Sequence, residues 1–202
     1  MLAEQTGPHE MHTDDRINLL AKVARTPHSP DVEGRGTSDR SILMLAAASY
    51  GSRPTDESTV PTGFDPFAAA LFESIVEGAY LVATSDGIFD DEERRTFERI
   101  VTAACGGSVP QSHVADLVSD LADQLGEDGI DRRVARLAEG VQREEQALEV
   151  LRIAALIAQV SDDVSEVERS VLVKIATACQ LGDGAVERAL EDVKASLASD
   201  PS

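Results

Sequence analysis

The feature that most restricts the fold of this chain is an internal repeat. Residues 79–102 match residues 154–177 without a gap, so that each position has a counterpart 75 residues later (79 to 154). The pair Glu93–Arg94 recurs as Glu168–Arg169, and small or aliphatic residues recur around both pairs. Solenoid repeats are about 20–50 residues long, so this period is too long for one. We therefore expect one domain with pseudo-two-fold symmetry, in which each copy is an αα-hairpin.

Apolar residues recur at helical spacing after Asp65, and no segment alternates as a strand does. Aromatic residues make up 3% of the chain and Trp is absent, so the core must consist of aliphatic residues and Ala, which suits packed helices. The pattern predicts an all-α fold. The helices that we expect in this part of the chain span about 66–85, 90–105, 110–125, 131–141, 144–160, 165–180 and 183–199.

Residues 1–63 differ from the rest, because they hold five of the eight prolines and so interrupt regular structure. Two short helices are expected there, over about 14–25 and 39–50. We expect 1–63 to be a loosely ordered N-terminal region, with a disordered tail as the alternative, and 64–202 to be the helical domain.

The loops inside the two copies are rich in acids. Asp90 and Ser165 are expected helix N-caps, and Glu93 and Glu168 complete capping boxes three residues later. Carboxylates are also the ligands of hard cations. The candidate metal ligands are Asp86, Asp90, Glu93, Asp162 and Glu168, for Ca²⁺, Mn²⁺ or Mg²⁺. Asp162 and Glu168 join this set if the two hairpins meet at the pseudo-dyad; otherwise capping and a solvated acidic surface account for the acids.

The sequence SDGIFDDEERRTFERIV, followed by VSDDVSEVERSVLVKIATACQLGDG, resembles the paired acidic loops of the TerB (tellurite-resistance) family over about residues 66–198. The resemblance implies a compact bundle of about seven helices, acidic patches and an association with metal or tellurite stress. TerB-like modules also occur as accessory domains, so the family does not by itself determine one function. Ser161–Asp162 stands where the family has Asp–Gly. Cation binding is therefore expected first at Asp86, Asp90 and Glu93.

The charge of the chain restricts its partners. It has 18 Lys and Arg against 37 Asp and Glu, a formal net charge of −19. Nucleic acids and anionic membrane surfaces repel such a protein, whereas cations and basic proteins are attracted. Acids stand where a signal peptide would have basic residues, and the longest apolar run, 42–48, is far shorter than the ~20 residues that span a bilayer. We expect a cytoplasmic protein without membrane insertion.

Motifs of enzymes are missing from the sequence. It contains no Glu-x-x-His pair for a di-iron centre, no G-x-S-x-G and no phosphate-binding loop. Cys105 and Cys179 are expected to be buried small residues, with a redox pair as the alternative. We predict a non-enzymatic protein that binds divalent cations in a metal- or stress-response setting and has an unidentified protein partner. The alternative is a protein-interaction or scaffold module whose acids are purely structural.

Overall fold

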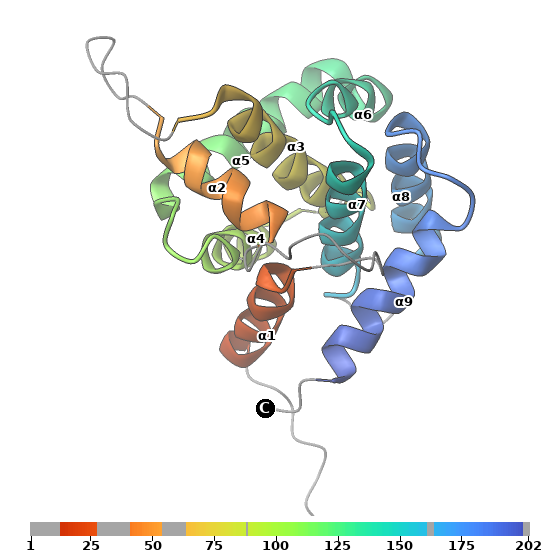
Figure 1. Cartoon of the computed structure of the whole chain (residues 1–202), viewed down its shortest axis with the longest axis horizontal. Coiled ribbons are helices and arrows are strands. Elements are labelled where there is room, and N and C mark those ends of the chain that lie inside the picture. The colour runs from red at the N-terminus through yellow and green to blue at the C-terminus, as the bar shows by residue number, and fades with distance from the viewer. Residues whose placement is uncertain (1–12, 28–40, 54–63, 88, 161–163, 200–202) are drawn as a thin grey trace, which may run out of the picture.

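The computed structural model of the chain describes residues 13–27, 41–53, 64–87, 89–160 and 164–199. Within these residues the protein has nine α-helices and no strand, which confirms the all-α prediction (Figure 1). The helices are α1 (Thr13–Arg25), α2 (Ile42–Gly51), α3 (Pro66–Ala83), α4 (Asp91–Ala104), α5 (Gln111–Asp128), α6 (Ile130–Glu139), α7 (Glu144–Ala158), α8 (Glu166–Ala178) and α9 (Ala185–Ala198).

Helices α3 and α7 form the centre of the bundle and pack on each other more extensively than any other pair (Figure 1). Gly78 on α3 allows this close approach, because a Cβ there would lie 3.0 Å from a methyl group of Val150 and 3.4 Å from one of Leu137. Both helices are buried along most of their length. A helix that is apolar on nearly all sides belongs at the centre of a bundle.

The helix boundaries on either side of the loop coincide in the two copies of the repeat. Helix α3 ends at Ala83 and α7 at its counterpart Ala158, while α4 and α8 begin after the equivalent N-caps Asp90 and Ser165. Each copy is therefore a helix, a short acidic loop and a second helix, as the ungapped match predicts. This places the two acidic loops in equivalent positions of the two hairpins.

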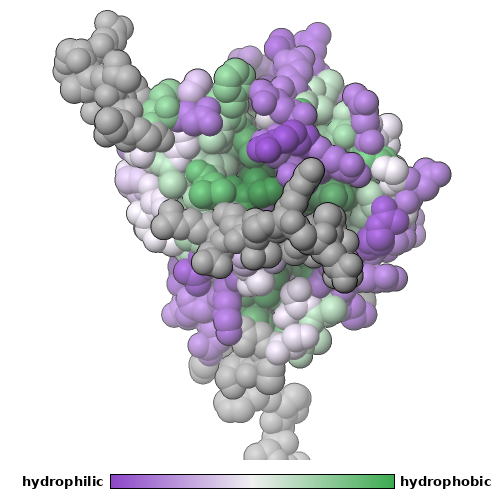
Figure 2. All heavy atoms as spheres, viewed as in Figure 1, coloured by the Kyte–Doolittle hydropathy of each residue, from purple (hydrophilic) through white to green (hydrophobic). Residues whose placement is uncertain are grey.

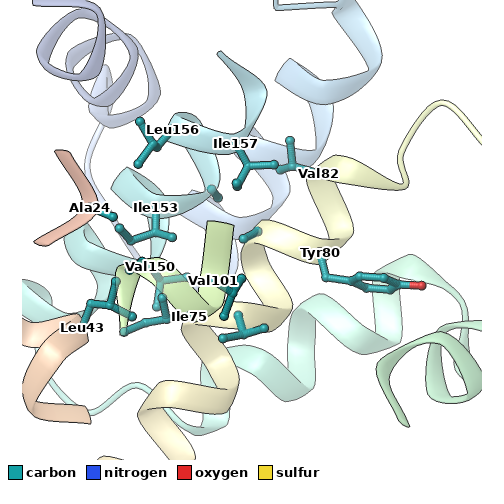
Figure 3. Close-up of a cluster of buried hydrophobic side chains, with 14 of the residues drawn as sticks. Ala24, Leu43, Ile75, Tyr80, Val82, Val101, Val150, Ile153, Leu156 and Ile157 are labelled. Atoms are coloured by element: carbon teal, nitrogen blue, oxygen red, sulfur yellow. The ribbon is translucent and has the colours of Figure 1, made fainter. Parts of the chain in front are cut away.

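The two short helices expected before residue 64 are present as α1 and α2, and both belong to the main core. Leu20 on α1 and Leu43 on α2 are each 2% exposed. Figure 3 shows Ala24 and Leu43 beside Ile75, Val150 and Ile153 of the two central helices. In the described part of the chain the bundle thus has nine helices rather than about seven, because its apolar core extends over α1 and α2. In the described residues before 64, these packed helices differ from the loose order expected there.

Helix α3 is the one helix in the described part of the chain that is long and apolar enough to cross a membrane, judged by length and composition. In this structure 67% of it is buried inside the protein, as is usual for the core helix of a bundle. Apolar surface also remains on α2, where Leu45 is 45% exposed. Figure 2 shows hydrophobic residues on this face of the molecule, with hydrophilic residues beside them.

Candidate functional site

A pocket of about 380 Å³ lies between the two hairpins. Its walls are the loop from α3 to α4, the first turns of α4, the end of α7 and the start of α8. Four carboxylates line it, together with a larger set of apolar side chains. The lining residues are Ala83, Asp86, Phe89, Glu92, Glu93, Thr96, Phe97, Ile100, Ile157, Val160 and Glu168. The site thus combines acids with an apolar floor.

Three of the five sequence-predicted ligands line this one pocket: Asp86, Glu93 and Glu168. The two glutamates are equivalent in the repeat, so the packing of the hairpins brings Glu93 and Glu168 to the same pocket. Asp90 does not line the pocket, and Asp162 lies outside the described residues. Among the residues that the structure describes, no three His, Cys, Asp or Glu side chains are arranged so that they could hold a metal ion.

The predicted capping boxes are present at both loops. Asp90 Oδ1 accepts hydrogen bonds from the backbone N–H groups of Glu92 and Glu93, at 2.8 and 2.9 Å. Glu93 Oε2 accepts from the N–H of Asp90 at 3.0 Å, and Glu168 Oε2 accepts from the N–H of Ser165 at 2.8 Å. Each cap bond uses one of two carboxylate oxygens, and a carboxylate has about four lone-pair sites. Capping therefore does not prevent Glu93 and Glu168 from contacting a cation.

Sequence reasoning missed the apolar floor of the pocket. Phe89 packs edge-on against Tyr80 and Phe97, with ring centroids 5.4 and 6.2 Å apart. Phe97 and Ile157 are almost fully buried, whereas Phe89 is half-buried. Figure 3 shows Tyr80 pointing away from the central cluster that contains Ile157. The only sequence signal was an apolar residue just before each N-cap, Phe89 and its counterpart Val164, which is typical of ordinary helix starts as well.

Helix α1 supports the end of α7 beside the pocket. The guanidinium group of Arg16 donates to the carbonyl oxygens of Gln159, at 3.5 Å, and of Val160. A cation is favourable at a helix C-terminus, where carbonyl groups lack helical partners. Arg16 thus stabilises the backbone that carries Val160 into the pocket wall. Sequence analysis did not find this role, because the contact joins residues more than a hundred positions apart.

Neither cysteine lines the pocket. Burial raises the pKa of the Cys105 thiol to about 12 and that of Cys179 to about 11. Both thiols are free and stay protonated near neutral pH, whereas the thiolate is the nucleophile and the metal ligand. Cys105 is buried, as expected, whereas Cys179 is only half-buried.

The family model described as "Tellurite resistance protein TerB" matches residues 73–191 of the chain. The match begins within α3, ends within α9 and includes both acidic loops and every residue that lines the pocket. Comparisons with the curated proteins and with the solved structures gave no significant match.

Proposed function

Because the chain belongs to the TerB family of tellurite-resistance proteins, we propose that it is a non-enzymatic protein that binds divalent cations in a metal- or stress-response setting. The binding site is the acidic part of the pocket between the two hairpins. Asp86, Glu93 and Glu168 bind the cation, which is Mg²⁺, Mn²⁺ or Ca²⁺.

The observation that carries this proposal is the convergence of acids from both copies of the repeat. Glu93 and Glu168 are far apart in the chain and line the same pocket, together with Asp86 and Glu92. The chain has a net charge of −19, so its electrostatic field concentrates cations around the protein. Fixed capping bonds also hold both glutamates in place before any ion arrives.

The spacing of the acids supports one mode of cation binding. Among the described residues no three acids are close enough to coordinate one ion directly. We therefore propose that the ion keeps part of its water shell and that the carboxylates contact it partly through water, as is usual for Mg²⁺ in proteins. Binding of this kind is weak, selects poorly between divalent ions and is screened by salt.

Thermal unfolding in millimolar MgCl₂, MnCl₂ and CaCl₂ tests the proposal. An ion that binds only the folded state raises the melting temperature, and the rise grows with the logarithm of the ratio between the ion concentration and its Kd. The triple variant Asp86→Asn/Glu93→Gln/Glu168→Gln should lose this rise. Gln at the third helical position retains the capping box, so the variant removes charge without removing the caps.

A variant with the same loss of charge elsewhere serves as the control. Asp116→Asn/Asp123→Asn/Glu127→Gln removes three exposed charges from α5, none of which lines the pocket. This control should keep the ion-induced rise in melting temperature. An equal loss in both triple variants would show a general effect of net charge, and no rise with any of the three ions would refute cation binding.

A further inference from the structure

We propose that the same pocket is a docking site for a basic segment of a partner protein, which inserts an apolar side chain between the two hairpins. This inference goes beyond cation binding, because it assigns a function to the apolar floor and names the chemistry of the partner. It does not depend on whether a metal ion binds.

The apolar floor is the first reason. A hydrated ion needs only the acids, yet Phe89, Phe97, Ile100, Ile157 and Val160 line most of the pocket. They come from both hairpins, and the pocket that they line together with the acids has a volume of about 380 Å³. Pockets that bind ligands enclose about 300–1,000 Å³ and are mainly apolar, with a few polar groups that orient the ligand. The floor therefore suits an aliphatic or aromatic side chain.

The acids around this floor are the second reason. Asp86, Glu92 and Glu93 are exposed, and Glu168 is half-buried. Exposed acids continue past the pocket in the first turns of both helices, at Asp91 on α4 and Glu166 on α8. A segment with Lys or Arg on either side of its apolar residue places positive charges against these acids. Such charge complementarity speeds association and determines the register of binding.

A second copy of this chain is a poor occupant. Both copies would carry a net charge of −19, and the docking face is itself acidic, so like charges would oppose each other across the interface. A basic partner gains from the same field that repels a copy. We therefore assign the pocket to a partner of opposite charge.

A short end-blocked peptide of alternating Lys and Leu is a suitable probe. Its binding is followed by isothermal titration calorimetry in EDTA, so that metal ions do not contribute. Two peptides serve as controls: Lys alternating with Ser, which lacks the apolar side chains, and Glu alternating with Leu, which reverses the charge. The Lys–Leu peptide should bind saturably, less tightly at high salt, and at least about tenfold more tightly than either control.

Substitutions at Thr96 test whether the peptide enters the pocket. Thr96 lines the pocket and is half-buried, so Thr96→Trp fills the space, whereas Thr96→Ala leaves it open. Thr96→Trp should weaken peptide binding about tenfold or more, because the apolar side chain of the peptide can no longer enter the pocket and a central anchor is lost. Thr96→Ala should leave peptide binding nearly unchanged.

Glu92→Lys provides a second variant, because this exposed position tolerates a charge reversal without disturbing the core. It should also weaken binding.

Several outcomes would overturn the inference. Equal binding of the Lys–Leu and Lys–Ser peptides would reduce it to general electrostatic attraction. Full binding by folded Thr96→Trp, or full binding by Glu92→Lys if the Trp variant does not fold, would exclude this pocket. Self-association that the peptide does not disrupt, and that Thr96→Trp abolishes, would assign the pocket to a second copy. If divalent ions raise the melting temperature but the peptide does not bind, docking is refuted and cation binding stands. If the peptide binds but no divalent ion raises the melting temperature, only cation binding is refuted.

Discussion

Arg152 and Glu149 form an ion pair inside the core, in which Arg152 Nε donates to Glu149 Oε2 at 2.8 Å and the side chains are 7% and 3% exposed. The same guanidinium group donates to the last carbonyl oxygens of α1, those of Val23 and Ala24, at 3.1 and 2.9 Å. Glu149 Oε1 accepts from the backbone N–H of Leu43 at the start of α2, at 3.2 Å. This pair therefore fixes the end of α1 and the beginning of α2 to the central helix α7.

Removing one member of this pair should be costly. Arg152→Met leaves the Glu149 carboxylate buried without its cation, and such changes cost about 3–5 kcal/mol. The double variant Glu149→Gln/Arg152→Met should lose less stability than Arg152→Met alone. Its buried charge is gone, and the new Gln side chain can still accept the hydrogen bond from the backbone N–H of Leu43. Urea unfolding of the three proteins measures the difference. A double variant that is less stable than Arg152→Met would contradict this account.

An exposed ion pair provides the comparison. Arg169 and Glu187 lie 3.2 Å apart, with side chains 45% and 59% exposed. Because water competes for both groups, Arg169→Met should change the free energy of unfolding by less than about 1 kcal/mol. A loss as large as that of Arg152→Met would mean that burial does not explain the difference.

Glu77 should make stability depend on pH. Burial raises the pKa of Glu77 above its ordinary value of 4.5, although Arg133 donates to it at 2.6 Å and opposes the shift; Glu73 and Asp128 raise the pKa further. A raised pKa means that the folded state holds this proton more tightly than the unfolded state, so its stabilising effect is lost as pH rises through the folded-state pKa. Relative to Glu77→Gln, the wild type should lose stability as pH rises from below 4.5.

Asp128 should give the opposite dependence and serves as the control. Its small burial opposes ionisation, but hydrogen bonds from Arg132 and Arg133 outweigh this and lower the pKa of Asp128 below 3.8. A lowered pKa stabilises the folded state above the unfolded-state pKa, and the effect is lost as pH falls through the folded-state pKa. Relative to Asp128→Asn, the wild type should therefore gain stability as pH rises. Chemical unfolding across pH, with both variants, would contradict the account if the two slopes had the same sign.

The parts of the fold that sequence could predict are those that depend on neighbours in the chain. The capping boxes at Asp90 and Ser165 need residues within one helical turn, and both are present. The apolar floor was not predictable, because Phe97 and Ile157 meet there only after the two hairpins pack. The packing of α1 was missed for the same reason: Arg152 reaches its backbone across more than a hundred residues.

Replacing glycine by alanine should lower the stability of the protein at Gly51 and raise it at Gly126. A Cβ on Gly51, at the end of α2, would lie 1.9 Å from the carbonyl oxygen of Ser108. The two backbones must move apart to admit it, and such overpacking costs about 1–3 kcal/mol. Gly126 lies within α5, and no atom is within 4 Å of the Cβ that a side chain would add. Gly126→Ala should therefore raise stability by about 0.5–1 kcal/mol. Thermal unfolding measures both, and destabilisation by both substitutions would contradict the packing argument.

Gln180 adopts a left-handed backbone conformation, with φ at 57°. It follows the last turn of α8, and the N–H of Leu181 beyond it donates to the carbonyl oxygen of Ala176 at 2.9 Å, a bond that requires this turn. In the other copy of the repeat α4 ends with Gly106 in the same conformation, with φ at 58°. Gln180 therefore carries a steric cost that the first copy avoids.

Replacing Gln180 by Gly should relieve this cost. A non-glycine residue in the left-handed region is disfavoured by about 1–2 kcal/mol, and part of the gain is lost because Gly is freer in the unfolded chain, so we expect a net rise in stability of about 1 kcal/mol. Gln159 at the end of α7 is the matched control. Its φ is −85°, so it carries no cost of a left-handed conformation that Gly could relieve. Gln159→Gly should lower stability by up to about 1 kcal/mol. Urea unfolding distinguishes the two variants, and a Gln180→Gly protein less stable than the wild type would mean that the Gln180 side chain stabilises the turn by more than the backbone conformation costs.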